Sequence, residues 1–202
     1  MITAKVIGIS RHRLRTDGEG VTTLVAFNGC PLRCKYCLNN HCWDPEMGRE
    51  YTPETLFEET KIDQLYFLAT HGGVTFGGGE PLLQVAFIKE FRSLCGPQWQ
   101  ILAETSLNVP LENVEALDPV LDGYIVDIKD MNPDIYKAYT GKDNVLVLKN
   151  LEWILQRRGA ESITLRVPHI PEFNTDEDVA RSMERLKAMG VINFDEFNYI
   201  IR

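Results

Sequence analysis

The sequence has no hydrophobic run long enough to cross a membrane and no excess of basic charge. Its longest stretch without Asp, Glu, Lys or Arg covers residues 64–79 and is interrupted by glycines, whereas a membrane-spanning helix needs about 20 mainly apolar residues. Gly8 and Arg11 interrupt the short apolar run near the N-terminus, so no secretory signal is expected. Lys and Arg number 21 against 29 Asp and Glu, a net charge of −8. That balance argues against binding nucleic acid through bulk charge, and we expect a cytoplasmic protein with neither a nucleic-acid nor a membrane partner.

Internal repeats, low-complexity tracts and linkers rich in Pro or Ser are also absent, so one domain is expected over residues 1–202. Runs typical of strands cover residues 21–29, 73–76, 100–104, 123–127, 162–167 and 194–200. Amphipathic segments typical of helices lie near residues 53–68, 84–95, 111–117, 134–158 (in two pieces) and 176–189. This alternation predicts an α/β fold of parallel β-α units. About six strands are too few for a closed eight-unit barrel, so an open, partial (β/α)6 TIM-like barrel and a doubly wound sheet both fit.

Clusters of chemically reactive or polar residues follow the first four expected strands. They are three cysteines after the first strand, then residues 77–80, residues 104–106 and residues 127–129. Because the carboxyl ends of parallel strands meet at one edge of a sheet or barrel, we expect these clusters to form a single site.

The five cysteines are the unusual part of the composition. Cys30, Cys34 and Cys37 form a C-x3-C-x2-C motif, while Cys42 and Cys95 stand apart. An odd number of cysteines without an export signal is poor support for disulfides, and clustered thiols in such chains more often bind metal. A structural zinc site closes with four ligands, and Cys42 or His41 could supply the fourth. Three cysteines holding a [4Fe–4S] cluster would instead leave one iron open for a small molecule.

The cysteine motif, with the aromatic Tyr36 before its last cysteine, resembles the signature of the radical S-adenosylmethionine superfamily. Within that superfamily, residues 16–20 and 28–37 resemble the glycyl-radical-enzyme activases, and the resemblance extends over about residues 5–200. It implies the open (β/α)6-type barrel, a [4Fe–4S] cluster on the three cysteines and S-adenosylmethionine at the open iron. The implied activity is reductive cleavage of S-adenosylmethionine to a 5′-deoxyadenosyl radical, which abstracts a hydrogen atom from a backbone glycine of a partner glycyl radical enzyme. A reduced flavodoxin or ferredoxin would supply the electron, and no side-chain general base is required.

The glycine-rich segment Gly77, Gly78, Gly79, Glu80 follows the second expected strand. A glycine-rich turn alone is weak support for a ligand site, because it often marks only a backbone that needs positive φ. A phosphate cradle is disfavoured, since no Lys-Ser/Thr follows and Glu80 would repel phosphate. A carboxylate beside exposed backbone groups suits an ammonium group, and in the resembling family this motif contacts the amino group of S-adenosylmethionine.

Glu104, Thr105 and Ser106 allow two interpretations. One is a solvated turn that caps a helix. The other is the acidic-Thr-polar segment that the activases carry here, although Leu107 stands where that family often has glycine.

Asp127 and Lys129 are two residues apart, so strand geometry points them the same way. The resemblance implies that Lys129 contacts S-adenosylmethionine. It also implies that the acidic residues of the two loops, Glu104 and Asp127, lie near a monovalent cation. A surface ion pair is the alternative.

Arg166 allows two interpretations. In the resembling family its planar guanidinium would hold the methionine carboxylate or ribose oxygens, and otherwise an arginine at a strand end is usually a salt-bridge partner. His169 is expected to be solvated or hydrogen-bonded, and Asn198 is the nearest polar candidate for a histidine that contacts S-adenosylmethionine in the activases.

The remaining expectations concern departures from the family and alternatives to it. The chain lacks a ferredoxin-like cysteine insert, so a single cluster is expected. Cys42 and Cys95 are expected to be unligated, and the protein is expected to be a monomer. The basic run Arg11, His12, Arg13 and Arg15 is expected to form a solvated turn, with docking to a partner as the alternative. The other functions considered are a radical enzyme that modifies a peptide or small molecule and a non-enzymatic zinc or interaction module.

Overall fold

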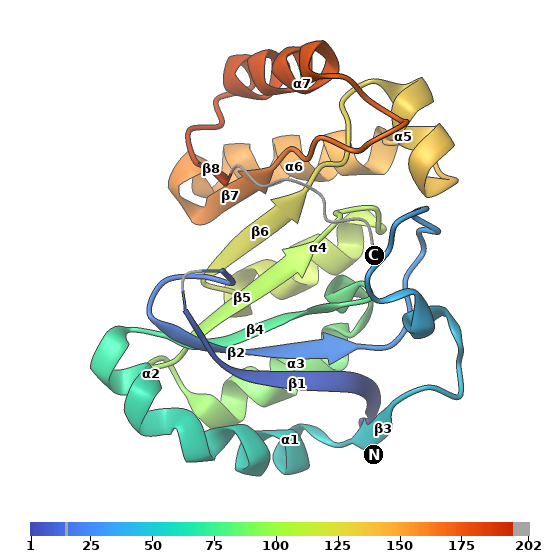
Figure 1. Ribbon diagram of the computed structural model, residues 1–202. Helices are drawn as coiled ribbons and strands as arrows, with labels where there is room; N and C mark the ends of the chain where they lie inside the picture. The colour runs from blue at the N-terminus through green and yellow to red at the C-terminus, as the bar shows by residue number, and fades with distance from the viewer. Residues whose placement is uncertain (15, 196–202) are drawn as a thin grey trace.

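The centre of the protein is an open eight-stranded sheet with the strand order β3-β1-β2-β4-β5-β6-β7-β8 (Figure 1). The computed structural model describes residues 1–14 and 16–195. Neighbouring strands from β2 to β8 are parallel, and they are β2 (Val21–Phe27), β4 (Gly73–Gly78), β5 (Gln100–Thr105), β6 (Gly123–Asp127), β7 (Ile163–Arg166) and β8 (Phe194–Asp195). They correspond to the six expected strands and confirm the α/β fold. The expected continuation of the last strand to residue 200, with Asn198, lies outside the described residues.

Two antiparallel strands at one edge of the sheet were not expected from the sequence. β1 (Ala4–Leu14) pairs with β2, and β3 (Arg49–Tyr51) pairs with the other side of β1. Within residues 1–14 and 16–195, the sheet therefore ends at β3 on one side and β8 on the other and does not close. This arrangement is the open form of a β/α barrel.

The expected solvated turn around the basic run is wrong. Arg11, His12 and Arg13 belong to β1, where the pairing register shifts between Ser10 and Arg13. Arg11 and His12 both contact the buried carboxylate of Asp63, with Arg11 Nε 2.7 Å and His12 Nε2 2.9 Å from its oxygens. A charged partner therefore draws this run into the sheet; Arg15 lies outside the described residues.

Seven α-helices of the described residues connect or flank the strands: α1 (Pro53–Thr60), α2 (Gln64–Thr70), α3 (Val85–Cys95), α4 (Leu111–Leu117), α5 (Pro133–Thr140), α6 (Val145–Arg158) and α7 (Asp176–Ala188). The single helix expected at residues 53–68 is interrupted by a 3-10 turn, η2 (Lys61–Asp63), which places Asp63 against β1 and β2. The two pieces expected within residues 134–158 are α5 and α6, and Gly141 ends α5 with a φ of 78°. Within the described residues, no helix combines the length and apolar character that crossing a membrane requires.

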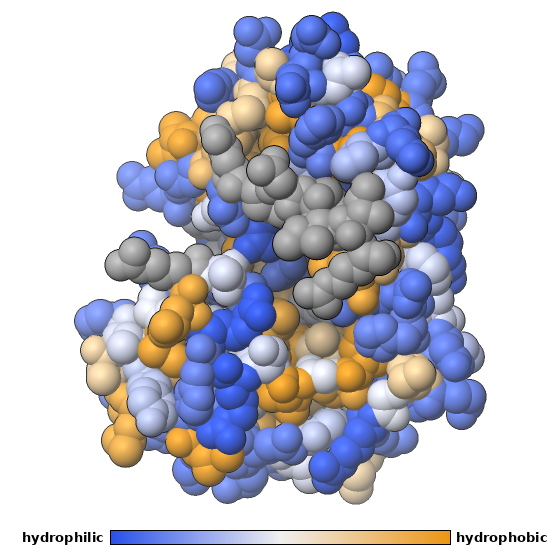
Figure 2. Space-filling view, viewed as in Figure 1, coloured by the Kyte–Doolittle hydropathy of each residue, from blue (hydrophilic) through white to orange (hydrophobic). Residues whose placement is uncertain are grey.

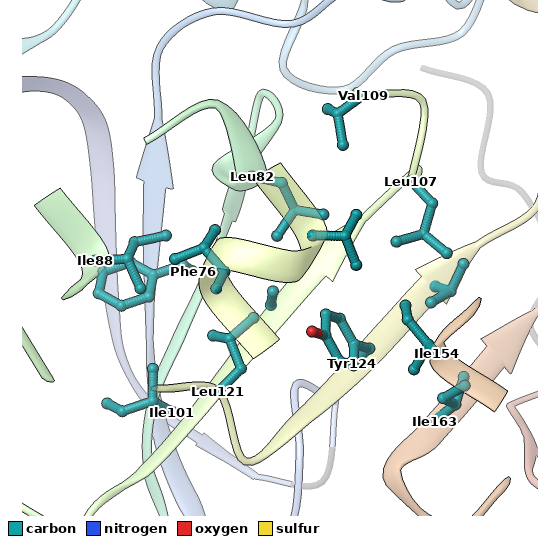
Figure 3. Packing of buried hydrophobic residues seen from close by; sticks show 14 of the residues in the cluster. Phe76, Leu82, Ile88, Ile101, Leu107, Val109, Leu121, Tyr124, Ile154 and Ile163 are labelled. Carbon is teal, nitrogen blue, oxygen red and sulfur yellow. The ribbon is translucent and has the colours of Figure 1, made fainter. Parts of the chain in front are cut away.

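The largest hydrophobic core lies between the sheet and the helices that cover it (Figure 3). Phe76 and Ile101 from the strands pack with Ile88 of α3, and Tyr124 and Ile163 from later strands lie in the same cluster. Burying a side chain of this size stabilises the fold by about 1.5–3 kcal/mol. The core thereby fixes the strands, and with them the positions of the loops at their carboxyl ends.

Candidate active site

The loop that carries the cysteines and the glycine-rich loop are joined backbone to backbone. Gly79 N–H donates to Phe27 O at 2.9 Å, and Glu80 N–H donates to Gly29 O at 2.8 Å. The side-chain amide of Asn39 also donates to Gly78 O, at 3.1 Å. These bonds make the ends of β2 and β4 one rigid unit, and Asn39 is a positioning residue that the sequence reasoning missed.

Two of the glycines are required by this close approach. A Cβ atom on Gly79 would lie 2.1 Å from Gly29 O, and one on Gly78 would lie 2.5 Å from the Cβ of Ala26. Gly78 also has a φ of +90°, which side chains disfavour. The glycine motif therefore has a structural cause in this chain, which is contact with β2 and the cysteine loop.

The other side of the cysteine loop rests on the C-terminal end of α5. Arg33 N–H donates to Thr140 O at 2.9 Å, and Lys35 N–H donates to Tyr139 O at 3.1 Å. These carbonyls belong to the last turn of α5, whose C=O groups lack partners within the helix. The cysteine loop therefore supplies the missing donors, and α5 sets its position.

Tyr36 lies among aromatic rings beside the cysteines. Its ring centroid is 6.1 Å from that of Tyr139 and 5.8 Å from that of Phe173. Its hydroxyl donates to Glu172 at 2.8 Å, and this bond raises the pKa of Tyr36. The ring and hydroxyl both hold the cysteine loop against the segment that follows β7.

The three thiols of the motif lie at an apolar boundary. Cys34 is buried, and Cys30 and Cys37 are half-buried, in a small cluster that also contains Leu32 and Ile170. Burial raises the pKa of Cys34 to about 11 and raises that of Cys30 as well. A bound metal reverses this preference, because a coordinating thiol is deprotonated.

The donor set fits an iron–sulfur cluster. The three thiols of the motif lie on one loop, with Cys34 buried and Cys30 and Cys37 half-buried, and thiolates are the usual ligands of such clusters. Zinc needs its ligands around a single atom, with each sulfur about 2.3 Å away, whereas a cubane cluster accepts one thiolate on each of several irons. Of the other two cysteines, Cys42 is buried near the motif and Cys95 is the last residue of α3.

Glu80 is completely buried and binds the next strand end. Its carboxylate accepts hydrogen bonds from Thr105 Oγ1 at 2.6 Å, Ser106 Oγ at 2.7 Å and Ser106 N–H at 3.0 Å. Burial raises the pKa of Glu80, although these hydrogen bonds act in the opposite direction. Thr105 and Ser106 are themselves buried, so the solvated-turn interpretation of this segment is wrong.

Leu107 keeps the backbone conformation that glycine would favour. Its φ is +56°, which costs about 1–2 kcal/mol for a residue with a side chain. Its side chain is fully buried in the main core (Figure 3). Thr105 Oγ1 accepts its N–H at 2.9 Å, and Asn150 Nδ2 donates to its carbonyl at 2.8 Å. Core packing and these two bonds hold the strained turn.

Asp127 and Lys129 form an ion pair inside the site. Lys129 Nζ contacts Asp127 Oδ2, with side chains only 9% and 20% exposed. The alternative of a surface ion pair is therefore wrong. Asp127 Oδ1 is buried and has no hydrogen-bond partner in the described part of the chain.

Arg166 joins four segments at the ends of the strands. Its guanidinium lies 3.2 Å from Glu104 Oε1 and 2.8 Å from Asp195 Oδ2, and it donates to Thr16 O in the β1–β2 connection. Burial raises the pKa of Glu104, and the charge of Arg166 opposes that rise. His169 lies 3.3 Å from Asp176 and is about half exposed, as expected for a solvated or hydrogen-bonded histidine.

Asp130 is a second residue that the sequence reasoning missed. This buried carboxylate accepts hydrogen bonds from Asn132 N–H at 2.8 Å, Asn174 Nδ2 at 3.1 Å and Ser182 Oγ at 3.3 Å. It follows Lys129, whose φ is +64°. Asp130 therefore ties the turn that carries Lys129 to α7 and to the segment after β7; the Asp-x-Asn turn was the available signal.

A family comparison identifies the class of protein that this fold and site define. The model of the radical SAM superfamily matches residues 24–193. The chain belongs to this superfamily.

Curated relatives narrow the comparison to activating enzymes. The chain is 40% identical over 142 residues to the pyruvate formate-lyase-activating enzyme of Clostridium pasteurianum, a match that covers 70% of this chain and 59% of the relative. It is 38% identical over 233 aligned positions to the (2S)-3-sulfopropanediol dehydratase activating enzyme of Klebsiella oxytoca, which covers 85% of this chain and 73% of that one. The chain thus spans about three-fifths to three-quarters of the length of these relatives.

Solved structures show the same fold at low sequence identity. SuiB of Streptococcus suis bound to S-adenosylmethionine superimposes with a TM-score of 0.68 at 12% identity, over 85% of this chain and 38% of that one. The open, partial barrel is therefore the fold of this chain, in agreement with the expectation from its sequence.

Proposed function

We propose that this chain is a glycyl-radical-enzyme activase. In this proposal Cys30, Cys34 and Cys37 hold a [4Fe–4S] cluster, and S-adenosylmethionine binds at the open iron. When bound and reduced, the cluster supplies the electron that cleaves S-adenosylmethionine, and the resulting 5′-deoxyadenosyl radical removes a hydrogen atom from a backbone glycine of the partner enzyme. The protein contributes orientation and exclusion of water. No side chain acts as a general base.

The strand ends supply the groups that would hold S-adenosylmethionine. In this proposal the glycine-rich segment of residues 77–80 contacts its amino group, and Glu80 ties that segment to Thr105 and Ser106 on the next strand end. Lys129 and Arg166 are the cations nearest the ligand in this proposal, with Tyr36 beside the cysteines. Lys129 forms an ion pair with Asp127, and Arg166 forms one with Glu104.

Glu104 and Asp127 are the proposed ligands of a monovalent cation. Both carboxylates lie at adjacent parallel strand ends, and Asp127 keeps one buried oxygen without a partner among the described residues. A cation there would satisfy that oxygen, because buried polar atoms normally have a partner.

The remaining parts of the proposal concern partners and organisation. A glycyl radical enzyme is the protein substrate, and a reduced flavodoxin or ferredoxin is the electron donor. The chain works as a single-domain cytoplasmic monomer under anaerobic conditions. The names of the curated relatives support the partner class, since both are activating enzymes of this kind.

The observation that carries the proposal is the direct bonding of the cysteine loop to the glycine-rich loop. To test it, we would reconstitute and reduce the protein anaerobically, and then mix the reduced protein and S-adenosylmethionine with candidate glycyl radical enzymes. A glycine-centred EPR doublet in the partner is the expected result. Cys34→Ala should abolish the doublet, whereas Cys95→Ser, a cysteine change on α3, should retain it.

Two other outcomes would redirect the assignment. Cleavage of S-adenosylmethionine without a doublet in any partner would favour a radical enzyme that modifies a peptide or small molecule. A colourless protein with stoichiometric zinc would favour the non-enzymatic module and contradict the proposal.

A further inference from the structure

Lys129 lies in a strained turn just after β6. The N–H of Asp130 donates to Ile128 O at 2.8 Å and closes a γ-turn around Lys129, whose φ is +64°. A γ-turn with positive φ is rare and strained, and such a conformation persists only where the surrounding structure holds it. Before the turn, Ile128 N–H donates to Arg166 O on β7 at 3.1 Å. A second restraint is therefore needed after Lys129.

The side chain of Asp130 supplies that restraint. Asp130 is 1% exposed, and uncharged donors from three segments surround its carboxylate. Its Oδ1 accepts from Asn132 N–H at 2.8 Å and from Ser182 Oγ at 3.3 Å, and its Oδ2 accepts from Asn174 Nδ2 at 3.1 Å. Two acceptor oxygens are required here, whereas an amide side chain has only one. Asp130 therefore bonds the turn to its own loop, to α7 and to the segment between β7 and α7.

The contact with α7 extends to the residue after Asp130. Ser182 Oγ also accepts the N–H of Met131 at 3.0 Å, and Arg185, one turn later on α7, donates to Met131 O at 3.1 Å. Figure 2 shows mainly hydrophilic surface over α7, at the top of the view, whereas Ser182 is only 2% exposed. The helix therefore turns Ser182 inward, against the Lys129 turn.

The segment between β7 and α7 also holds the cysteine loop. Figure 1 shows this segment passing beside α5 before it enters α7. The ring centroid of Phe173 is 5.8 Å from that of Tyr36. The next residue, Asn174, is buried, accepts Ile170 N–H at 2.6 Å and donates to Asp130. The Lys129 turn and the cysteine loop therefore rest on the same segment, which fixes their relative positions.

We infer that Asp130 is a positioning residue for the binding of S-adenosylmethionine, because it holds the strained turn that directs the ammonium group of Lys129. This inference rests on the proposed function, in which Lys129 contacts that ligand. Without the restraint, the backbone of Lys129 would relax toward negative φ, the ordinary region for a residue with a side chain, and its Cβ would point elsewhere. Asp130 acts through Lys129, since its own two oxygens are occupied by three protein donors.

Hydrogen–deuterium exchange of the apoprotein tests whether Asp130 holds the turn. The N–H groups of residues 130–132 are all hydrogen-bonded in this network, so their exchange reports its opening. Asp130→Asn keeps the shape of the side chain but removes one acceptor oxygen, and we expect these amides to exchange about tenfold faster. Asp118→Asn is the matched control, because it makes the same change at a buried carboxylate that lies before β6. The control should leave this exchange within about twofold of that in the unsubstituted protein.

Reductive cleavage of S-adenosylmethionine by the reconstituted protein, with dithionite as reductant, tests the effect on the ligand. We expect Asp130→Asn to raise KM for S-adenosylmethionine about tenfold and to leave kcat within about twofold, because a weakened contact with the bound ligand lowers its affinity. Asp118→Asn should leave both constants unchanged. Ser182→Ala removes a single donor to Asp130, so it should raise KM less, and it tests the same network if Asp130→Asn does not fold.

A double substitution shows whether Asp130 acts through Lys129. Lys129→Met keeps an unbranched side chain but removes the ammonium group, and it should raise KM on its own. Adding Asp130→Asn should then raise KM by no more than about twofold further, because residues that act through one contact are not additive. The same tenfold rise in both backgrounds would overturn the inference, as would a KM that Lys129→Met leaves unchanged.

The two kinds of measurement separate this inference from the proposed function. Exchange needs neither the cluster nor the ligand, so unchanged exchange in Asp130→Asn would overturn the inference whatever reaction the protein performs. Faster exchange with an unchanged KM would also overturn it. Absence of cleavage by the unsubstituted, iron-loaded protein would instead contradict the proposed function, and the exchange rates would still decide whether Asp130 holds the turn.

Discussion

Replacing Gly79 with alanine would push the cysteine loop away from the glycine-rich loop. The new Cβ would lie 2.1 Å from Gly29 O, and real Cβ atoms essentially never approach closer than 3.0 Å. Because packed interiors have few voids, the loop must move by roughly 1 Å. The backbone carbonyl that moves precedes Cys30 directly, so the displacement reaches the first thiol of the motif.

The expected loss of stability follows from the contacts that this displacement breaks. Two backbone hydrogen bonds join the loops here, from Gly79 to Phe27 and from Glu80 to Gly29. Each is worth about 1 kcal/mol, and overpacking adds about 1–3 kcal/mol. We therefore expect Gly79→Ala to lower the free energy of unfolding by about 3–5 kcal/mol.

Urea unfolding of the apoprotein measures this loss, and iron content after anaerobic reconstitution measures the effect on the cysteines. Gly8→Ala is the matched control, because a Cβ at Gly8 meets nothing within 4 Å and its φ is not left-handed. We expect Gly79→Ala to retain less iron than this control. Equal unfolding free energies and equal iron contents in the two variants would refute the argument that backbone contact requires this glycine.

Three further substitutions test separate parts of the structure. Leu107→Gly should relieve about 1–2 kcal/mol of backbone strain but lose about 2–5 kcal/mol of core packing, so urea unfolding should show a less stable protein; a more stable one would contradict the packing explanation. Burial raises the pKa of Asp63, but hydrogen bonds from Arg11 and Thr23 outweigh it and lower that pKa. The stabilisation that Asp63 provides should therefore be present above about pH 4 and be lost as the pH falls further. If the free energy of unfolding of Asp63→Asn fell equally steeply with falling pH, that role would be contradicted. Tyr36→Phe removes the exposed bond to Glu172 but keeps the ring, so it should retain iron as the unsubstituted protein does. Tyr36→Ala should retain less iron, and equal iron retention in both variants would contradict a role for the ring.

The parallel strands and the grouping of the site at their ends could be predicted from sequence because both depend on local patterns. Short runs typical of strands, which alternate along the chain with amphipathic helical segments, predicted the six parallel strands. The motif residues directly follow the first four of these strands. The sequence did not predict β1, because the second half of this strand is basic and a run of basic residues usually indicates a solvent-exposed turn. Only the distant Asp63, which lies on η2, makes Arg11 and His12 acceptable within the sheet.

The roles of individual site residues depended on contacts that no local pattern contains. Glu80 was interpreted as a group that faces a ligand, yet in the structure its carboxylate binds Thr105 and Ser106 on the next strand end. Leu107 departs from the family's glycine but keeps its left-handed backbone, because Asn150 of α6 and the core hold it. Such pairings join residues far apart in the chain, so the sequence alone did not reveal them.

EPR spectroscopy of the anaerobically reconstituted, reduced protein, before and after addition of S-adenosylmethionine, tests the central claim most directly. We predict about four irons per chain and a cluster signal that changes when S-adenosylmethionine is added. Cys95→Ser should behave in the same way, and Cys34→Ala should show no such signal. A cluster signal that S-adenosylmethionine leaves unchanged, or a colourless protein with one zinc per chain, would contradict the account.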